Sequence, residues 1–140
     1  MTKREEPQGG LPRNYLRATL LLLIGEAPAH GYELMEQIGE LGLRTIDAGG
    51  LYRALRVMEA DGLVASAWEH SASGPARRTY TLTQEGYEWL HAWAGALRET
   101  HRYLSAYLSR YEAVEVAGSP PAAAGDGGTA PRGSGAEVSP

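Results

Sequence analysis

The chain has 140 residues, enough for one domain of ordinary size with additional segments. It contains no cysteine, which excludes disulfides, a catalytic thiol and zinc sites built from cysteine. Its net charge is −4, but a nucleic-acid footprint is a local feature of a surface, so the acidic total does not exclude a DNA partner.

The first ten residues, MTKREEPQGG, are polar and contain no apolar segment of the kind that secretory signals carry. The longest apolar run covers residues 20–24, far below the ~20 residues that span a bilayer. We therefore expect a cytoplasmic protein with no membrane segment, and we expect residues 1–10 to form a flexible N-terminal arm.

Two helices are expected next, because apolar side chains recur with the period of a helix that buries one face. The first should end near Gly25, and Gly42 should close the second. The glutamates of the second helix, at positions 33, 36 and 40, should point outward. The expected inward residues are Leu16, Leu20, Leu23 and Ile24 in the first helix and Leu34, Met35, Ile38 and Leu41 in the second.

A third helix is expected after Asp47, whose carboxylate is suited to cap the first turn. Its inner face should consist of Leu51, Leu55 and Met58, and Asp-Gly at positions 61–62 should end it.

Residues 63–69 and 78–82 are expected to form two strands. Tyr80 and Leu82 should lie on one face of the second strand, with its threonines on the other. The intervening SASGPA should be a turn made stiff by Gly74-Pro75.

A long last helix is expected from Thr83, a good N-cap, to about Ala113. At 1.5 Å per residue it would be ~45 Å long, too long for so small a domain to cover, so its distal half should pack on a second copy. Residues 118–140, rich in Gly, Pro, Ala and Ser, should be disordered. The residues expected in the dimer seam recur at about 3.5-residue spacing and are Leu90, Trp93, Leu97, Leu104, Leu108 and Tyr111.

The order of three helices, two strands and a helix predicts a mainly α fold with a small β-hairpin, a winged helix-turn-helix over residues 11–83, followed by a dimerisation helix over 84–117. In such modules the third helix enters the major groove, ~12 Å wide, and the hairpin, or wing, contacts the backbone or minor groove. Side chains off the buried face of that helix should reach DNA. The expected DNA-binding residues are Arg44, Gly50, Tyr52, Arg53 and Arg56, with Ser71, Arg77 and Arg78 from the wing.

Three alternatives stay open at these positions. Each arginine is suited to a guanine edge or to a phosphate. Tyr52 is suited either to a phosphate or to packing on the second helix. Arg77 and Arg78 alternate sides of a strand, so one should face DNA while the other pairs with an acid such as Glu69.

Three motifs in order also carry a family resemblance: HGYEL at 30–34, GGLYRALRVMEADGLV at 49–64 and GPARRTYTLTQEG at 74–86. Together they resemble the PadR family of bacterial transcriptional regulators over about residues 16–108. The segment at 66–80, SAWEHSASGPARRTY, is similar to the polyhydroxybutyrate-responsive repressors within it. Gly50 departs from the family pattern, where many members carry Thr or Ser, which puts one phosphate contact in doubt.

The resemblance implies a homodimeric repressor with no catalytic activity and no metal or other cofactor. The residues agree, because no histidines have metal-ligand spacing and no phosphate-binding loop is present. Some members bind flat hydrophobic effectors at the dimer interface, which gives Trp89 and Trp93, one turn apart, a second interpretation beside dimer core. We expect a sequence-specific repressor that binds a pseudo-palindromic double-stranded operator and is released by a small hydrophobic effector. The alternative is a winged-helix module that binds another protein.

Overall fold

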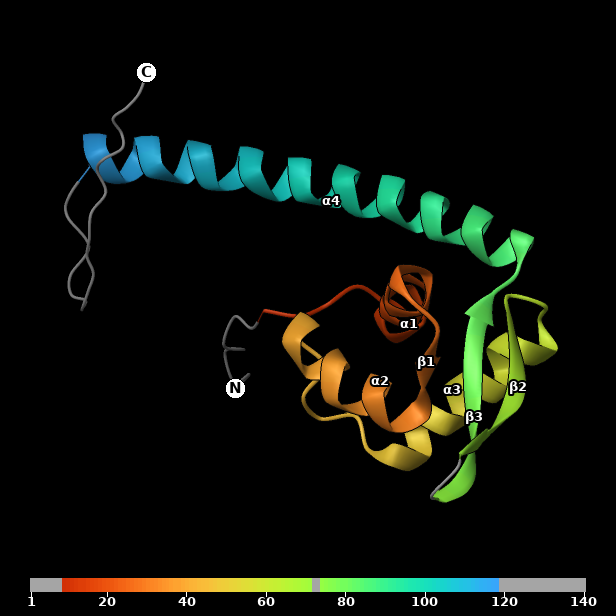
Figure 1. The fold of residues 1–140 in the computed structure, drawn as a ribbon. Helices are drawn as coiled ribbons and strands as arrows, with labels where there is room; N and C mark the ends of the chain where they lie inside the picture. The colour runs from red at the N-terminus through yellow and green to blue at the C-terminus, as the bar shows by residue number, and fades with distance from the viewer. Residues whose placement is uncertain (1–8, 72–73, 119–140) are drawn as a thin grey trace, which may run out of the picture. The chain divides into compact units, whose positions relative to one another are not determined.

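The computed structural model describes residues 9–71 and 74–118. The chain divides into two compact units, one up to Ala96 and one from Leu97 onward, and the long C-terminal helix α4 contributes to both. The first unit holds three helices and a small antiparallel sheet (Figure 1). This architecture confirms the predicted winged helix-turn-helix with a long last helix.

Helix α1 covers Tyr15–Glu26 and provides one side of the core. Leu20, Leu23 and Ile24 are buried, as the apolar period predicts, whereas the expected Leu16 is only half-buried. The helix also buries Ala18, Thr19 and Leu21, which were not expected to point inward. The helix ends one residue after Gly25, because Ala27 is already extended. The short helix α2, Gly31–Gln37, continues directly into a short 3₁₀ helix, η1, Ile38–Leu41.

Helix α2 differs from the expectation at Glu33, which does not point freely outward. The backbone N–H of His30 donates to Glu33 Oε1 at 2.9 Å, so the carboxylate turns back to cap the helix that it belongs to. Gly42 ends η1 with φ of 101°, a left-handed conformation that favours glycine.

Helix α3 covers Ala48–Ala60 and buries Leu51, Leu55 and Met58, which confirms its predicted inner face. The predicted cap is also confirmed, because the Gly50 N–H donates to Asp47 Oδ1 at 2.8 Å.

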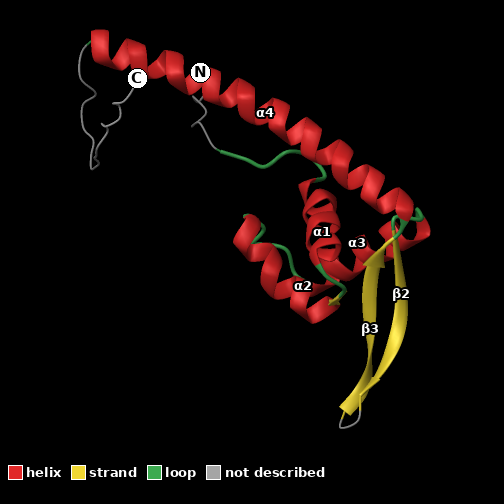
Figure 2. Ribbon diagram, turned by 45° about the horizontal axis from the view of Figure 1, so that its top comes forward, coloured by secondary structure: helices red, strands yellow, loops and turns green. Residues whose placement is uncertain are grey.

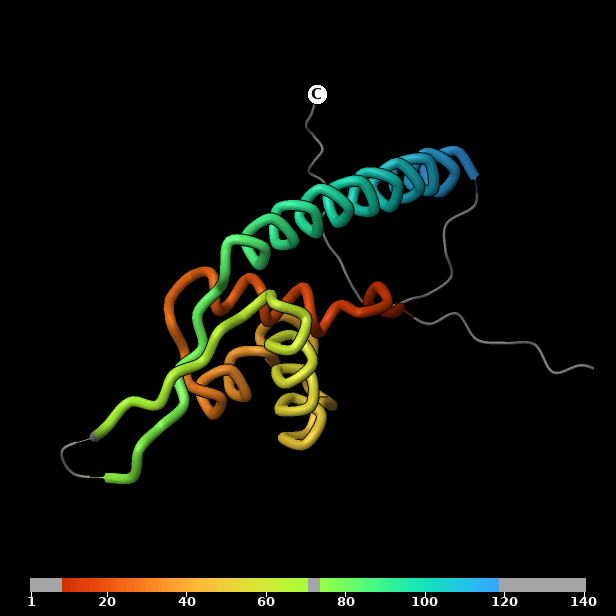
Figure 3. The backbone as a smooth tube through the Cα atoms, turned by 90° about the vertical axis from the view of Figure 1, so that its right-hand side faces the viewer, coloured from red at the N-terminus to blue at the C-terminus, as the bar shows by residue number. Residues whose placement is uncertain are grey.

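The sheet has three strands in the order β1-β3-β2. Figure 2 labels the two long strands, β2 and β3. Strands β2, Val64–Ser71, and β3, Gly74–Leu82, form the hairpin, and the two-residue β1, Ala29–His30, pairs with β3 at Tyr80 and Thr79. The sequence does not predict β1, because two residues carry no detectable period. The hairpin runs out past the ends of α2 and α3 as an arm (Figure 3).

One detail of the hairpin corrects the prediction, and a second adds to it. SASGPA is not all turn, because Ser71 pairs with Gly74 and β3 begins there. Pro75 is tolerated because β1 pairs with β3 only at residues 79–80, which leaves an open edge beside it. The threonines also differ in burial, since Thr79 lies in the region covered by β1 and is buried whereas Thr81 is exposed.

Helix α4 covers Gln84–Ala117 and begins at the predicted cap, where the Gly86 N–H donates to Thr83 Oγ1 at 3.0 Å. Its first turns pack on the core through Leu90 and Trp93. The helix ends at Ala117, four residues beyond the helix end expected near Ala113 and at the last residue of the segment expected to dimerise. None of the helices within residues 9–71 and 74–118 is long and apolar enough to cross a membrane.

Candidate nucleic-acid interface

The outer face of α3 carries the first group of predicted contact residues. Arg53, Arg56 and Val57 are exposed, opposite the fully buried Leu51 and Leu55. The buried face ties the helix rigidly to the core, so the exposed face presents two arginines from a fixed backbone. The exposed face of this helix therefore carries two positive charges and no acidic side chain at positions 52, 53, 56 and 57.

Gly50 and Arg53 lie together at the first turn of α3. A Cβ added at Gly50 would lie 3.2 Å from the capping Asp47 Oδ1 and 3.8 Å from Arg53 Nη2. The absent side chain therefore leaves room for the cap and for the arginine to lie over the first turn. Arg44 is exposed in the loop before this helix.

Tyr52 lies against Gly31 at the start of α2. Any side chain at Gly31 would collide with the Tyr52 ring and hydroxyl. Of the two roles expected for Tyr52, a phosphate contact or packing on the second helix, the structure shows the packing. The side chain is still 39% exposed. This close approach requires glycine at position 31.

Arg77 lies on the face of the hairpin that meets α2. Its Nη1 donates to the Tyr32 hydroxyl at 2.7 Å, and its guanidinium carbon lies 5.4 Å from the centre of the Tyr32 ring. The Tyr32 ring is parallel to the His30 ring, with the centres 5.6 Å apart. The two nitrogens of His30 lie 3.1 Å from Glu33 Oε1 and 3.2 Å from Glu69 Oε1.

Arg78 lies on the other face of the hairpin, towards α3. Its guanidinium carbon is 4.9 Å from the centre of the Trp68 ring, and its Nη1 is 3.9 Å from Glu59 Oε1. Glu59 also accepts a hydrogen bond from the Ser66 hydroxyl at 2.9 Å. The acid within 4 Å of Arg78 is therefore Glu59. The expected Glu69 lies opposite Arg77 in the strand register, but its carboxylate contacts His30 rather than an arginine.

The carboxylates around His30 are stabilised in their charged form. The backbone N–H of His30 lowers the pKa of Glu33, with further lowering by the His30 ring and by Arg77. The Thr79 hydroxyl, followed by the His30 ring, lowers the pKa of Glu69. Both groups thus add negative charge beside Arg77 at neutral pH.

The remaining wing residue, Ser71, ends β2 opposite Gly74. The sequence does not indicate that Tyr32, His30, Glu59 and Trp68 are parts of this site. Their partners lie up to 45 residues away in the chain, so no local spacing indicates the contacts. The sequence feature that could have indicated His30 and Tyr32 is their position at the start of a helix, within HGYEL at 30–34.

The expected dimer residues fall into two groups. Leu90 and Trp93 pack against the core of their own chain. Leu97 is half-buried, and three residues of the second unit are exposed, namely Leu104, Leu108 and Tyr111.

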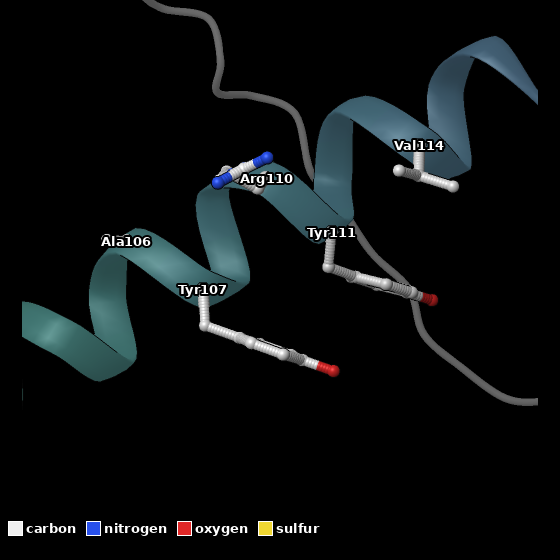
Figure 4. A pocket seen from close by; sticks show the side chains of 5 residues that line it. All are labelled: Ala106, Tyr107, Arg110, Tyr111 and Val114. Carbon is white, nitrogen blue, oxygen red and sulfur yellow. The ribbon is translucent and has the colours of Figure 1, made fainter.

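The distal part of α4 carries a surface hollow, and the described residues that line it all lie on this helix (Figure 4). Tyr107, Tyr111 and Val114 point to one side there, and Arg110 points away from them. Trp89, at 50% exposure, differs from Trp93, one turn later, which packs on the core. The two tryptophans proposed for an effector are therefore unequally available. Within the described residues no three potential metal ligands cluster.

Comparison with known proteins identifies the family. The profile of the transcriptional regulator PadR-like family matches residues 20–92. Among curated protein sequences there is no significant match.

Solved structures give the same result. A PadR family transcription regulator from Clostridium difficile R20291 is 26% identical with a TM-score of 0.62, over 68% of this chain and 99% of its own. A PadR family transcriptional regulator from Eggerthella lenta DSM 2243 is 30% identical with a TM-score of 0.58, over 69% of this chain and 83% of its own. Bacillus subtilis PadR in complex with operator DNA is 23% identical with a TM-score of 0.53, over 58% of this chain and 47% of its own. With the family profile covering more than half of its length, the chain belongs to the PadR-like family of transcriptional regulators.

Proposed function

We propose that this protein is a sequence-specific DNA-binding repressor that acts in the cytoplasm and binds a pseudo-palindromic operator as a homodimer. The observation that carries the proposal is the exposed pair Arg53 and Arg56 on α3, beside a wing that presents Arg77 and Arg78. Helix α3 would enter the major groove and the wing would contact the backbone. The fold shared with Bacillus subtilis PadR, which is bound to operator DNA in its structure, supports this role.

Exposed apolar residues on the distal part of α4 support the homodimer. Leu104, Leu108 and Tyr111 are 59%, 54% and 48% exposed and recur on one side of the helix. Apolar residues at this spacing are typical of a helix that packs on another helix. Two copies would place two α3 helices on half-sites about one turn, ~34 Å, apart.

An effector would act on this same assembly. Trp89 offers an exposed ring for a flat hydrophobic molecule, and Trp93, one turn later, is partly buried against the core. Binding there would release the operator by changing how the two copies are held. Loss of effector binding in Trp89→Ala, with operator affinity retained, is the expected result in a fluorescence titration.

The operator is found by selecting duplexes that bind the full-length protein from a random-sequence library, with the enriched duplex used as the probe. Anisotropy titrations should show sequence-selective binding whose log affinity falls with log salt by about 0.9 per phosphate neutralised. Absence of an enriched sequence would contradict the proposal and favour binding of another protein by the winged helix.

Arg53→Ala and Arg56→Ala test the α3 surface directly. Each should weaken binding to the probe by ~1–3 kcal/mol if it reads a base, and should relax the preference at that base. Arg98→Ala removes an exposed arginine on α4 and serves as the matched control. Equal losses in all three variants would show that only net charge matters, against a specific role of α3.

A further inference from the structure

The contact between Tyr32 and Arg77 joins α2 to the wing. It combines a hydrogen bond of 2.7 Å with a guanidinium that lies 5.4 Å from the ring centre. Both side chains are exposed, with Tyr32 at 49%, so the contact lies at the surface. A guanidinium has five N–H donors, so the bond to Tyr32 leaves others free for an anion.

Tyr32 is itself held in place from two elements. Its ring is parallel to the ring of His30, the residue that precedes the first turn of α2. His30 in turn contacts Glu33 on α2 and Glu69 on β2. The hydroxyl that accepts from Arg77 is therefore placed by side chains of both the helix and the hairpin.

The two wing arginines differ in the charge of their partners. Arg78 lies 3.9 Å from a carboxylate, Glu59, which offsets its charge. Arg77 is bonded to a neutral hydroxyl, while the nearby carboxylates Glu33 and Glu69 are both engaged with the His30 ring. Glu33 and Glu69 add negative charge near Arg77, but neither forms an ion pair with its guanidinium among the described residues. The N–H groups of Arg77 that Tyr32 does not use therefore stay available to a phosphate, whereas Arg78 has a carboxylate 3.9 Å away.

We propose that Tyr32 is a positioning residue for operator binding, which holds the Arg77 guanidinium ready for a backbone phosphate and acts through Arg77 rather than by touching DNA. This inference rests on the proposed function. An arginine already held by the hydroxyl loses less side-chain freedom when the phosphate arrives, so removing the hydroxyl weakens binding.

The test is a double-mutant cycle on the selected operator duplex, with full-length wild type, Tyr32→Phe, Arg77→Ala and the double variant. Tyr32→Phe keeps the ring but removes the acceptor, and should weaken binding by about threefold to tenfold. Arg77→Ala should weaken it by about tenfold or more and reduce the salt slope by about 0.9. The double variant should bind as Arg77→Ala does.

Tyr103→Phe is the matched control. The Tyr103 hydroxyl also makes a hydrogen bond, to Glu99 at 3.3 Å, and Arg102 lies 5.7 Å from its ring centre. This variant should bind the duplex as wild type does. Arg78→Ala supplies a second background, in which Tyr32→Phe should still show its full loss.

Three results would overturn the inference. Unchanged affinity of Tyr32→Phe would show that the hydroxyl does not matter for binding. The same fold loss in the Arg77→Ala background would show that Tyr32 acts independently of Arg77. A wild-type protein that binds no duplex selectively would remove the proposed function and this inference together, whereas the first two results leave the proposed function intact.

Discussion

Single residues of this protein gain their roles from partners on other elements. Arg77 and Arg78 are adjacent in the chain, yet one is held by Tyr32 of α2 and the other lies beside Glu59 of α3. Each also lies over an aromatic ring, which suits a planar guanidinium. The wing is therefore held to both α2 and α3 of the first unit.

The carboxylates around His30 predict a pH dependence of stability. Folding lowers the pKa of Glu33 and of Glu69 below the ordinary value of 4.5. A lowered pKa contributes stability that is present above pH 4.5 and is lost as the pH falls through the folded value. The difference in denaturation midpoint between wild type and Glu69→Gln should therefore shrink below pH 4.5. A difference that stays constant from neutral to acid pH would contradict the prediction.

At the scale of elements, the start of α4 is set by one close approach. Gly86 is buried, and a Cβ there would collide with the backbone carbonyl of Leu63. The Thr83 hydroxyl donates to the Gly62 carbonyl at 2.6 Å and accepts from the Gly86 N–H. Helix α4 is thus joined to the end of α3 at a point where only glycine fits.

Gly86→Ala should destabilise the protein by ~1–3 kcal/mol, because a backbone carbonyl moves less readily than a side chain. Gly95→Ala is the control in the same helix, since its Cβ would meet nothing within 4 Å. That variant should gain ~0.5–1 kcal/mol from helix propensity. Urea denaturation measures both, and a neutral Gly86→Ala would refute the close approach.

At the scale of the whole molecule, α4 serves two purposes along its length. Leu90 and Trp93 complete the core of the first unit, so removing the whole helix would damage that unit. The proposed pairing surface lies further along, at Leu104, Leu108 and Tyr111. Assembly is therefore best tested by substitution in the full chain.

Leu104→Asp/Leu108→Asp should yield a folded monomer that binds the operator duplex far more weakly, because two half-sites no longer act together. Ala106→Asp/Ser109→Asp adds the same charge on the opposite side of the helix and should remain a dimer. Analytical ultracentrifugation separates the two outcomes. A wild-type protein that sediments as a monomer at micromolar concentration would count against the dimer.

The sequence by itself determined the order of the elements, the buried faces of α1 and α3 and the caps Asp47 and Thr83, because these depend on neighbours within a turn or two. Only the tertiary structure decided the pairing of β1, the burial of Thr79 and the attachment of Leu90 and Trp93 to the core. It also decided the partners of the wing arginines. His30 meets Glu69 across 39 residues and Tyr32 meets Arg77 across 45, distances that no local period in a sequence encodes.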